Sequence, residues 1–166
     1  MKIHIATDTY YPDVNGAAYF TYRLATSLAK RGHHVFVMCP SRSFKNTVSN
    51  DKGVTVYGIR SISILVYRNF RISPLFISRT IRGVVEEISP DIIHIQNHFL
   101  IGRRVVSAAK KLGIPVVGTN HFMPENLVHY LHLPGIVEKG LRKGDPIFDL
   151  SGQADVHGRS WCLDFM

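Results

Sequence analysis

Residues 3–29, with the sequence IHIATDTYYPDVNGAAYFTYRLATSLA, decide the fold. The first four, 3–6, form a short apolar run that is typical of a buried parallel strand. The turn-forming residues within 12–16 then end the strand, and an amphipathic helix follows at once. Because the unpaired N–H groups and the positive dipole end of this helix face the loop, and because Gly16 carries no Cβ, the junction predicts a seat for a phosphate group. It does not indicate which phosphate.

The same alternation of buried strands and amphipathic helices continues along the chain. Apolar residues recur at helical spacing in two later segments, as Ile77, Ile81, Val84, Val85 and Ile88 and again within 101–112. Strands are predicted at 3–6, 35–38, 53–59, 92–95 and 116–118, with a polar loop over 41–52. This order predicts an α/β fold, an open parallel Rossmann-like sheet with helices on both faces. Ligands of such sheets bind beyond the carboxyl ends of the strands, which here are 7–16, 96–99 and 119–125.

Two segments have no such clear pattern. Residues 61–71 mix β-branched and basic side chains, and a strand, an extended connection or a surface segment in a lipid interface all remain open. Residues 136–143 are compatible with a short basic helix. We expect a domain over 1–143 and an irregular tail over 144–166. The sequence shows no clear final strand for the sheet. The tail is interpreted either as poorly ordered or as the place where a longer chain has been truncated or frame-altered.

Composition narrows the classes of protein and partner. The chain has 166 residues, 45% of them hydrophobic, and a net charge of +8, which favours anionic partners such as nucleic acid, anionic lipid or a phosphorylated substrate. No apolar run reaches transmembrane length, and we expect no signal peptide because residues 1–2 lead directly into a strand. Its two cysteines have no CxxC spacing, so we expect a cytoplasmic protein. Its nine histidines include no HExxH and no Cys/His pairing at zinc spacing, so no metal is expected.

Three segments carry a resemblance to a known family. DTYYPDVNGAAYFTYRLATSLAKRGHHV, SPDIIHIQNHFLIG and GIPVVGTNHFMPENL lie in the order and at the strand ends found in family-4 retaining glycosyltransferases. The chain resembles their N-terminal, acceptor-side domain, which is one half of a GT-B fold, over roughly residues 1–140. The likeness is greatest to the lipid-glycosylating subgroup, which acts on diacylglycerol or phosphatidylinositol.

The resemblance implies roles for residues at the strand ends. Asn15 and Gly16 would lie against the diphosphate of a nucleotide-sugar donor, although Gly16 is also explained by a tight turn. Asp13 is expected to bind an acceptor hydroxyl or to shape its own loop. Gln96 stands where the family often has a histidine, and we expect it on the acceptor side.

His121 and His98 are the predicted catalytic residues. A neutral imidazole has one donor and one acceptor, which suits contact with sugar hydroxyls and transfer of the acceptor's proton. His98 stands where the family has an acidic residue. Glu125 joins the predicted acceptor site, with capping of its own loop as the structural alternative.

A basic patch is also predicted. Arg68, Arg71, Arg79 and Arg82, with nearby apolar residues, form a candidate surface for anionic lipid, against the alternative of a solvated helix face and a buried strand.

The predicted function is therefore the acceptor-binding half of a retaining glycosyltransferase, which moves a sugar from a nucleotide-sugar to a lipid or other hydroxyl acceptor. The nucleotide-sugar is a co-substrate and no cofactor is expected. The donor domain is missing from the chain, so we expect no transfer by the chain alone. The protein is expected in the cytoplasm, where it can be peripheral on the inner face of the membrane. The competing interpretation is a non-catalytic module that binds lipid or another subunit. Nucleic-acid binding rests on charge alone, and no recognition motif supports it.

Overall fold

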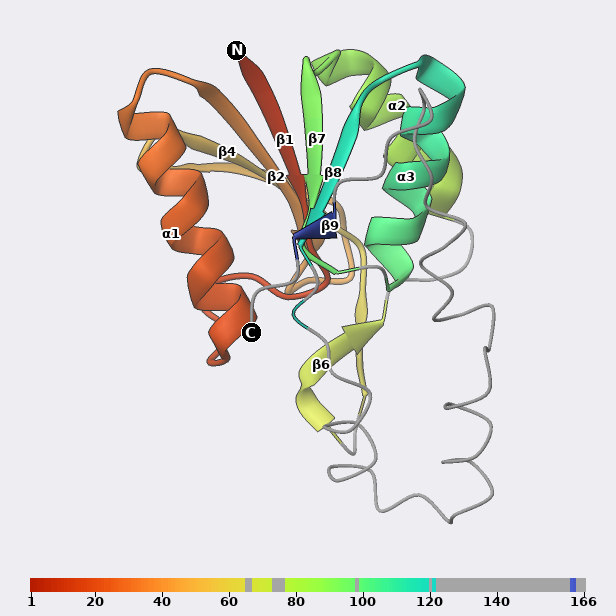
Figure 1. The fold of residues 1–166 in the computed structure, drawn as a ribbon. Helices are drawn as coiled ribbons and strands as arrows, with labels where there is room; N and C mark the ends of the chain where they lie inside the picture. Colours follow the sequence, from red (N-terminus) through yellow and green to blue (C-terminus); the bar gives the residue numbers. More distant parts are fainter. Residues whose placement is uncertain (65–66, 73–76, 98, 120, 122–161, 164–166) are drawn as a thin grey trace.

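The fold is a layered α/β domain, seen in a computed structural model that describes residues 1–64, 67–72, 77–97, 99–119, 121 and 162–163 (Figure 1). Seven strands form one sheet in the order β3-β4-β2-β1-β7-β8-β9, and β5 pairs with β6 beside it. The strands are β1 (Lys2–Ala6), β2 (His34–Pro40), β3 (Thr47–Asp51), β4 (Val54–Ile59), β5 (Ile62–Ile64), β6 (Tyr67–Ile72), β7 (Ile92–Ile95), β8 (Val116–Thr119) and β9 (Cys162–Leu163). The helices are α1 (Gly16–Lys30), α2 (Ser78–Ile88) and α3 (Leu100–Leu112).

Strand β1 lies at the centre of the sheet, parallel to β2 on one side and to β7 on the other. The chain builds outward from β1 to β2 and β4, and then returns to the other side for β7 and β8. The order of the strands therefore reverses between β1 and β7. In open α/β sheets the carboxyl ends at such a switch point form the ligand-binding crevice.

Helices cover both faces of the sheet, as predicted. Helix α1 packs on one face over a cluster that includes Ile5 and Val37, whereas α2 and α3 pack on the other over Met38 and Ile93 (Figure 1). Each of these four sheet residues has an exposed fraction of zero. Because successive side chains of a strand point to opposite faces, a run of consecutive apolar residues supplies both layers of core.

The prediction of a loop over 41–52 is wrong for its second half, where β3 pairs antiparallel with β4. Lys52 and Gly53 both have positive φ, 50° and 82°, which is the backbone of a tight two-residue hairpin turn. β3 was missed because four of its five residues are exposed and it shows no apolar alternation. The sheet is accordingly parallel except at this edge.

The segment left open at 61–71 is an antiparallel hairpin of β5 and β6. Within the predicted tail, Cys162–Leu163 form β9 parallel to β8, so the expectation that no final strand would be found is wrong for these two residues. The predicted helix at 136–143 lies outside the described residues, and the boundary at 143 stays a prediction. None of the described helices has the length and apolarity needed to cross a bilayer.

Candidate functional site

The candidate site lies where β1 and β7 end. The N–H of Gln96 donates to the carbonyl of Ala6 at 2.9 Å. The pairing of β7 with β1 therefore continues one residue past the end of β7. Gln96 is completely buried at the switch point. Its Oε1 accepts a hydrogen bond and its Nε2 has no partner in the described part of the chain.

His121 is the partner of that Gln96 oxygen. Its Nε2 lies 2.9 Å from Oε1 of Gln96, and its ring lies 4.9 Å, centroid to centroid, from the ring of Phe20 on α1. Since a carbonyl oxygen can only accept, Nε2 donates and Nδ1 is left as the acceptor. Burial lowers the pKa of His121 from its ordinary value of 6.5, so the imidazole is neutral at pH 7. A neutral, positioned imidazole whose second ring nitrogen is an acceptor can accept a proton from a hydroxyl group.

A second histidine, His94 on β7, lies two residues before Gln96 and contacts a threonine of β8. Nε2 of His94 and Oγ1 of Thr119 are 2.8 Å apart, and they join β7 to β8. Burial is the main cause that lowers the pKa of His94, and the nearby His121 adds to the effect. His94 and Gln96 alternate with the buried Ile93 and Ile95, so both face the α1 side of the sheet.

The start of α1 forms the adjoining wall. Asn15 caps the helix, because its Oδ1 accepts from the N–H of Ala18 at 2.8 Å. Its Nδ2 donates to Oγ1 of Thr9 at 2.7 Å, and that hydroxyl donates in turn to Oδ2 of Asp13 at 3.3 Å. An added Cβ at Gly16 would meet no atom of the described residues within 4 Å, and Gly16 does not have a positive φ, so the turn itself does not require glycine there.

Asp13 has an additional charged partner. Its Oδ1 lies 3.0 Å from the guanidinium of Arg42, in the loop that follows β2. The aspartate side chain is 14% exposed and the arginine 60%, so the pair lies at the surface and stabilises the fold by about 1 kcal/mol or less. The predicted site residues thus form two groups, Gln96 with His121 and Asp13 with Asn15, and the first turns of α1 contact both.

Asp8 belongs to this region and was not predicted. Its Oδ1 accepts from the N–H of Ile101 at 2.9 Å at the start of α3, while its buried Oδ2 has no partner among the described residues. Burial raises the pKa of Asp8 from 3.8 to about 6, although backbone N–H groups at the start of α3 oppose the shift. The sequence signal that could have identified Asp8 is a carboxylate two residues after the end of the first strand. Its burial, however, depends on a helix that starts about 93 residues later in the sequence.

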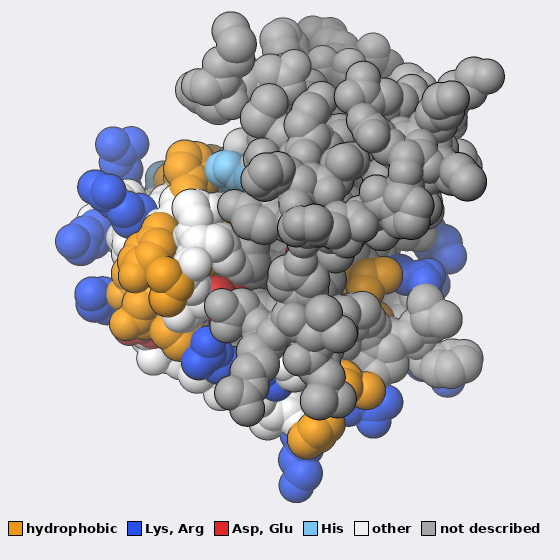
Figure 2. All heavy atoms as spheres, turned by 90° about the horizontal axis from the view of Figure 1, so that it is seen from below, with side chains coloured by type: hydrophobic (Ala, Val, Ile, Leu, Met, Phe, Trp, Pro, Cys, Tyr) orange, Lys and Arg blue, Asp and Glu red, His pale blue; other side chains and the backbone are white. Residues whose placement is uncertain are grey.

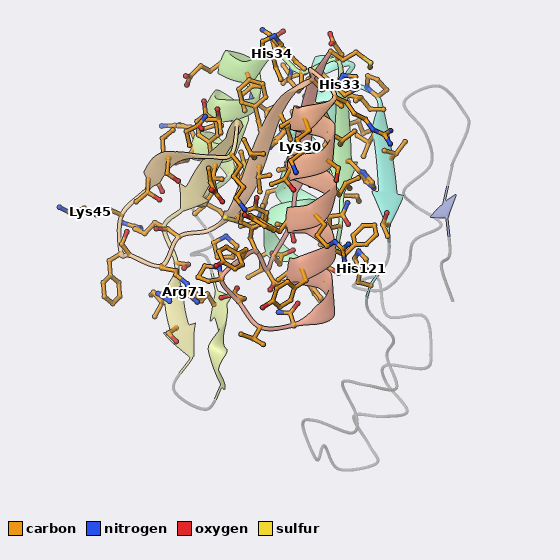
Figure 3. The ribbon with its side chains drawn as sticks, turned by 90° about the vertical axis from the view of Figure 1, so that its left-hand side faces the viewer. Lys30, His33, His34, Lys45, Arg71 and His121 are labelled. Atoms are coloured by element: carbon orange, nitrogen blue, oxygen red, sulfur yellow. The ribbon has the colours of Figure 1, made fainter. Side chains whose placement is uncertain are left out.

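Figure 2 shows the molecule from below, the end to which the strands of Figure 1 point; Lys and Arg side chains lie around its outline, and hydrophobic side chains gather on its left-hand side. Figure 3 places His121 beside the first turns of α1 and Arg71 at the same end of the molecule, whereas Lys30, His33 and His34 lie at the opposite end. Exposed hydrophobic side chains of this region include those of Tyr11, Val14, Tyr19, Phe20 and Phe44.

The guanidinium of Arg71 donates hydrogen bonds to neighbouring segments of the protein. Its Nε donates to the carbonyl of Ser41 at 3.0 Å and its Nη2 to the carbonyl of Arg42 at 2.9 Å. It therefore ties the β5–β6 hairpin to the loop after β2. Arg79 and Arg82 lie on α2, a separate element.

The remaining predicted residues are not described. His98 and Glu125 lie outside the described residues, and so does the side chain of Arg68. Among the described residues, no group of three or more His, Cys, Asp or Glu side chains could hold a metal ion.

Comparison with known proteins agrees with this architecture. The family model for Glycosyltransferase Family 4 matches residues 14–149. Alpha-monoglucosyldiacylglycerol synthase of Streptococcus pneumoniae is 31% identical over 131 residues, covering 79% of this chain and 29% of that protein. GDP-mannose-dependent alpha-mannosyltransferase of Corynebacterium glutamicum is 27% identical over 119 residues, covering 70% of this chain and 28% of that protein. The chain thus spans less than a third of the length of these relatives.

A solved structure has the same fold. Sucrose-phosphate synthase from Thermosynechococcus elongatus superposes with a TM-score of 0.53 at 11% sequence identity, over 99% of this chain and 48% of that one. The match to half of that chain identifies the α/β sheet described above as one half of a GT-B architecture. With the family model covering most of its length, the chain belongs to Glycosyltransferase Family 4.

Proposed function

We propose that the chain is the acceptor-binding half of a retaining glycosyltransferase that transfers a sugar from a nucleotide-sugar to a lipid hydroxyl. The observation that carries the proposal is the pair of His121 and Gln96 at the switch point of the sheet, beside the start of α1. A neutral imidazole held by a buried amide is suited to bind and orient a hydroxyl group. Family membership supports the same class of reaction.

In this proposal each wall of the site has its own ligand. Nδ1 of His121 accepts a hydrogen bond from the acceptor hydroxyl and can take its proton, and Gln96 holds the ring in place. Asn15 and Gly16 lie against the donor's diphosphate, because the start of α1 offers N–H groups and a positive dipole end. The open space beside Gly16 supports this role. Asp13 binds an acceptor hydroxyl from the neighbouring loop.

The relatives suggest the kind of partner. One printed name contains monoglucosyldiacylglycerol and another GDP-mannose, so a diacylglycerol-based acceptor and a nucleotide-sugar donor are the first to test. Since the chain spans less than a third of these relatives, we place the donor-binding half outside it and expect residues 1–143 to act as the acceptor-side domain.

We place the protein at the inner face of the membrane as a peripheral protein. Arg79 and Arg82 on α2 are exposed cations, and they support attraction to anionic lipid. Arg71 contributes less in this proposal, since its guanidinium already binds backbone carbonyls.

Two measurements test the proposal. The first follows the His121 imidazole of the 166-residue chain by NMR during titration with diacylglycerol in micelles, using empty micelles as the control. We expect the His121 resonances to shift with added diacylglycerol and those of His33, at the other end of α1, to stay unchanged. Absence of any specific shift would remove the acceptor-binding role.

The second measurement joins residues 1–143 to the donor half of the Streptococcus pneumoniae relative and assays sugar transfer from a panel of nucleotide-sugars. Transfer by this chimera, with none by the 166-residue chain, is the expected result. Lipid binding without transfer by a folded chimera would favour a non-catalytic module, and turnover by the 166-residue chain alone would contradict the half-enzyme proposal.

A further inference from the structure

A groove lined by cations runs between α2 and α3, on the face of the sheet opposite α1 (Figure 1). Its volume is about 230 Å³. A water molecule occupies about 30 Å³ of liquid volume, so the groove has room for a small hydrated anion. The polar residues that line it are Ser78, Arg79, Arg82, Arg104, Ser107 and Lys111, and no carboxylate is among its lining residues.

The positive charge of the groove is only partly offset. Arg82 pairs with Glu86 on the same helix at 2.7 Å. Within the described ranges, Arg79, Arg104 and Lys111 make no ion pair. Like charges that share one groove repel one another, and an anion bound between them would remove that repulsion.

The backbone of α2 adds a second, independent attraction for an anion. The helix begins at Ser78 beside the groove, with no acidic residue in its first turn and no side chain of the described residues capping its N–H groups. Its positive dipole end is therefore not neutralised by a side chain of its own. Hydroxyl groups at Ser78 and Ser107 offer further donors to oxygen atoms.

We propose that this groove binds a phosphate group. Guanidinium groups bind phosphate oxygens in pairs with matched geometry, and a lysine ammonium adds a point charge, so three arginines and one lysine make a donor set suited to a phosphate monoester or diester. The phosphate comes either from a lipid headgroup or from a small soluble molecule. The site is separate from His121, which lies on the α1 side of the sheet. It shares Arg79 and Arg82 with the proposed membrane contact and so rests on that part of the proposed function, but not on the proposed sugar transfer.

The test measures binding of two probes to the 166-residue chain at one salt concentration. Glycerol phosphate is titrated by calorimetry, and vesicles of phosphatidylcholine with and without phosphatidylglycerol are tested by co-sedimentation. The doubly substituted variant Arg104→Ala with Lys111→Ala removes two groove cations. Its matched control is Arg103→Ala with Lys110→Ala, which removes two exposed cations of the same helix that do not line the groove.

We expect the groove variant to bind at least one probe about tenfold or more weakly than the unaltered chain, because the phosphate loses charge-assisted hydrogen bonds to Arg104 and Lys111. The control variant should change binding by about twofold or less. An effect on glycerol phosphate identifies a soluble phosphate as sufficient, and an effect on the vesicles alone identifies a lipid source. Equal losses in the two variants, with folding confirmed by circular dichroism, would show attraction by net charge only and overturn the proposal. Failure of the unaltered chain to bind either probe would overturn it as well.

Discussion

Nε2 of His121 donates to Oε1 of Gln96 across 2.9 Å, and this bond joins the segments that follow β8 and β7, 25 residues apart in sequence. The glutamine is completely buried, so it holds the imidazole from the protein side. The ring of Phe20 packs beside the same imidazole. The position of the histidine is therefore set by two elements outside its own loop.

For His121→Ala we expect the rate of sugar transfer by the chimera with a donor half to fall by about 10²- to 10⁴-fold, because His121 is proposed to accept the proton of the acceptor hydroxyl. His33→Ala, at the other end of α1, serves as the control and should leave the rate unchanged (Figure 3). Rates are measured at saturating acceptor, and thermal unfolding checks that both variants fold. An unchanged rate in His121→Ala would leave the residue a purely structural role.

Asn15 is predicted to serve both helix capping and donor binding, and substitutions can separate the two. Asn15→Asp keeps the oxygen that accepts from Ala18, so urea unfolding should give a stability within about 0.5 kcal/mol of the unaltered chain. The added negative charge should nevertheless raise KM for the nucleotide-sugar in the chimera. Asn15→Ala should cost about 1 kcal/mol of stability through loss of the cap. A KM that is unaffected by Asn15→Asp would place the diphosphate elsewhere.

Asp8 should make stability depend on pH. Its pKa is about 6 in the folded state and 3.8 as the model value, so the folded state binds the proton more tightly. The stabilising contribution of the protonated carboxyl is complete below about pH 3.8 and is lost as the pH rises through about 6. The free energy of unfolding of Asp8→Asn, relative to the unaltered chain, should therefore rise by about 2–3 kcal/mol between pH 4 and pH 7.

This comparison cancels the opposite contribution of His4. Burial lowers the pKa of His4 to about 4, so its contribution to stability is lost as the pH falls below about 6.5, equally in both proteins. Urea unfolding at a series of pH values measures the difference directly. A difference that does not vary with pH would show that Asp8 titrates normally.

Two glycines on helices should respond in opposite directions to alanine. A Cβ at Gly102, in the first turn of α3, would overlap the carbonyl oxygen of Asn97, so Gly102→Ala should destabilise the fold by about 2 kcal/mol or more. Gly83 in α2 has no atom within 4 Å of such a Cβ, and Gly83→Ala should stabilise by about 0.5–1 kcal/mol. Thermal or urea unfolding distinguishes the two. Equal effects would mean that α3 can shift away from the loop after β7.

Much of the fold could be predicted because it depends on local patterns. The short apolar runs at β1 and β7 and the apolar stripes of α2 and α3 each report burial over a few residues. β3 could not be found in this way, since an exposed edge strand needs no apolar alternation and is defined by pairing with β4. The register of that pairing is set by the turn at Lys52 and Gly53.

The site was less predictable because its contacts cross long stretches of sequence. That Gln96 and His121 follow neighbouring strands could be predicted from the topology, but their hydrogen bond could not. The ion pair of Arg42 with Asp13 spans 29 residues and the bond of Asp8 to α3 spans 93. Such distant pairs depend on how helices dock on the sheet, and no local spacing encodes them.

Edge strand β3 also bears on how copies of the chain behave in solution. Without it, the apolar β4 would present a row of unpaired N–H and C=O groups to any neighbouring molecule. Thr47–Asp51, which are polar except for Val48 and mostly exposed, pair with β4 along that row instead. A largely polar border strand therefore disfavours edge-to-edge pairing of this sheet with the sheet of a neighbouring molecule.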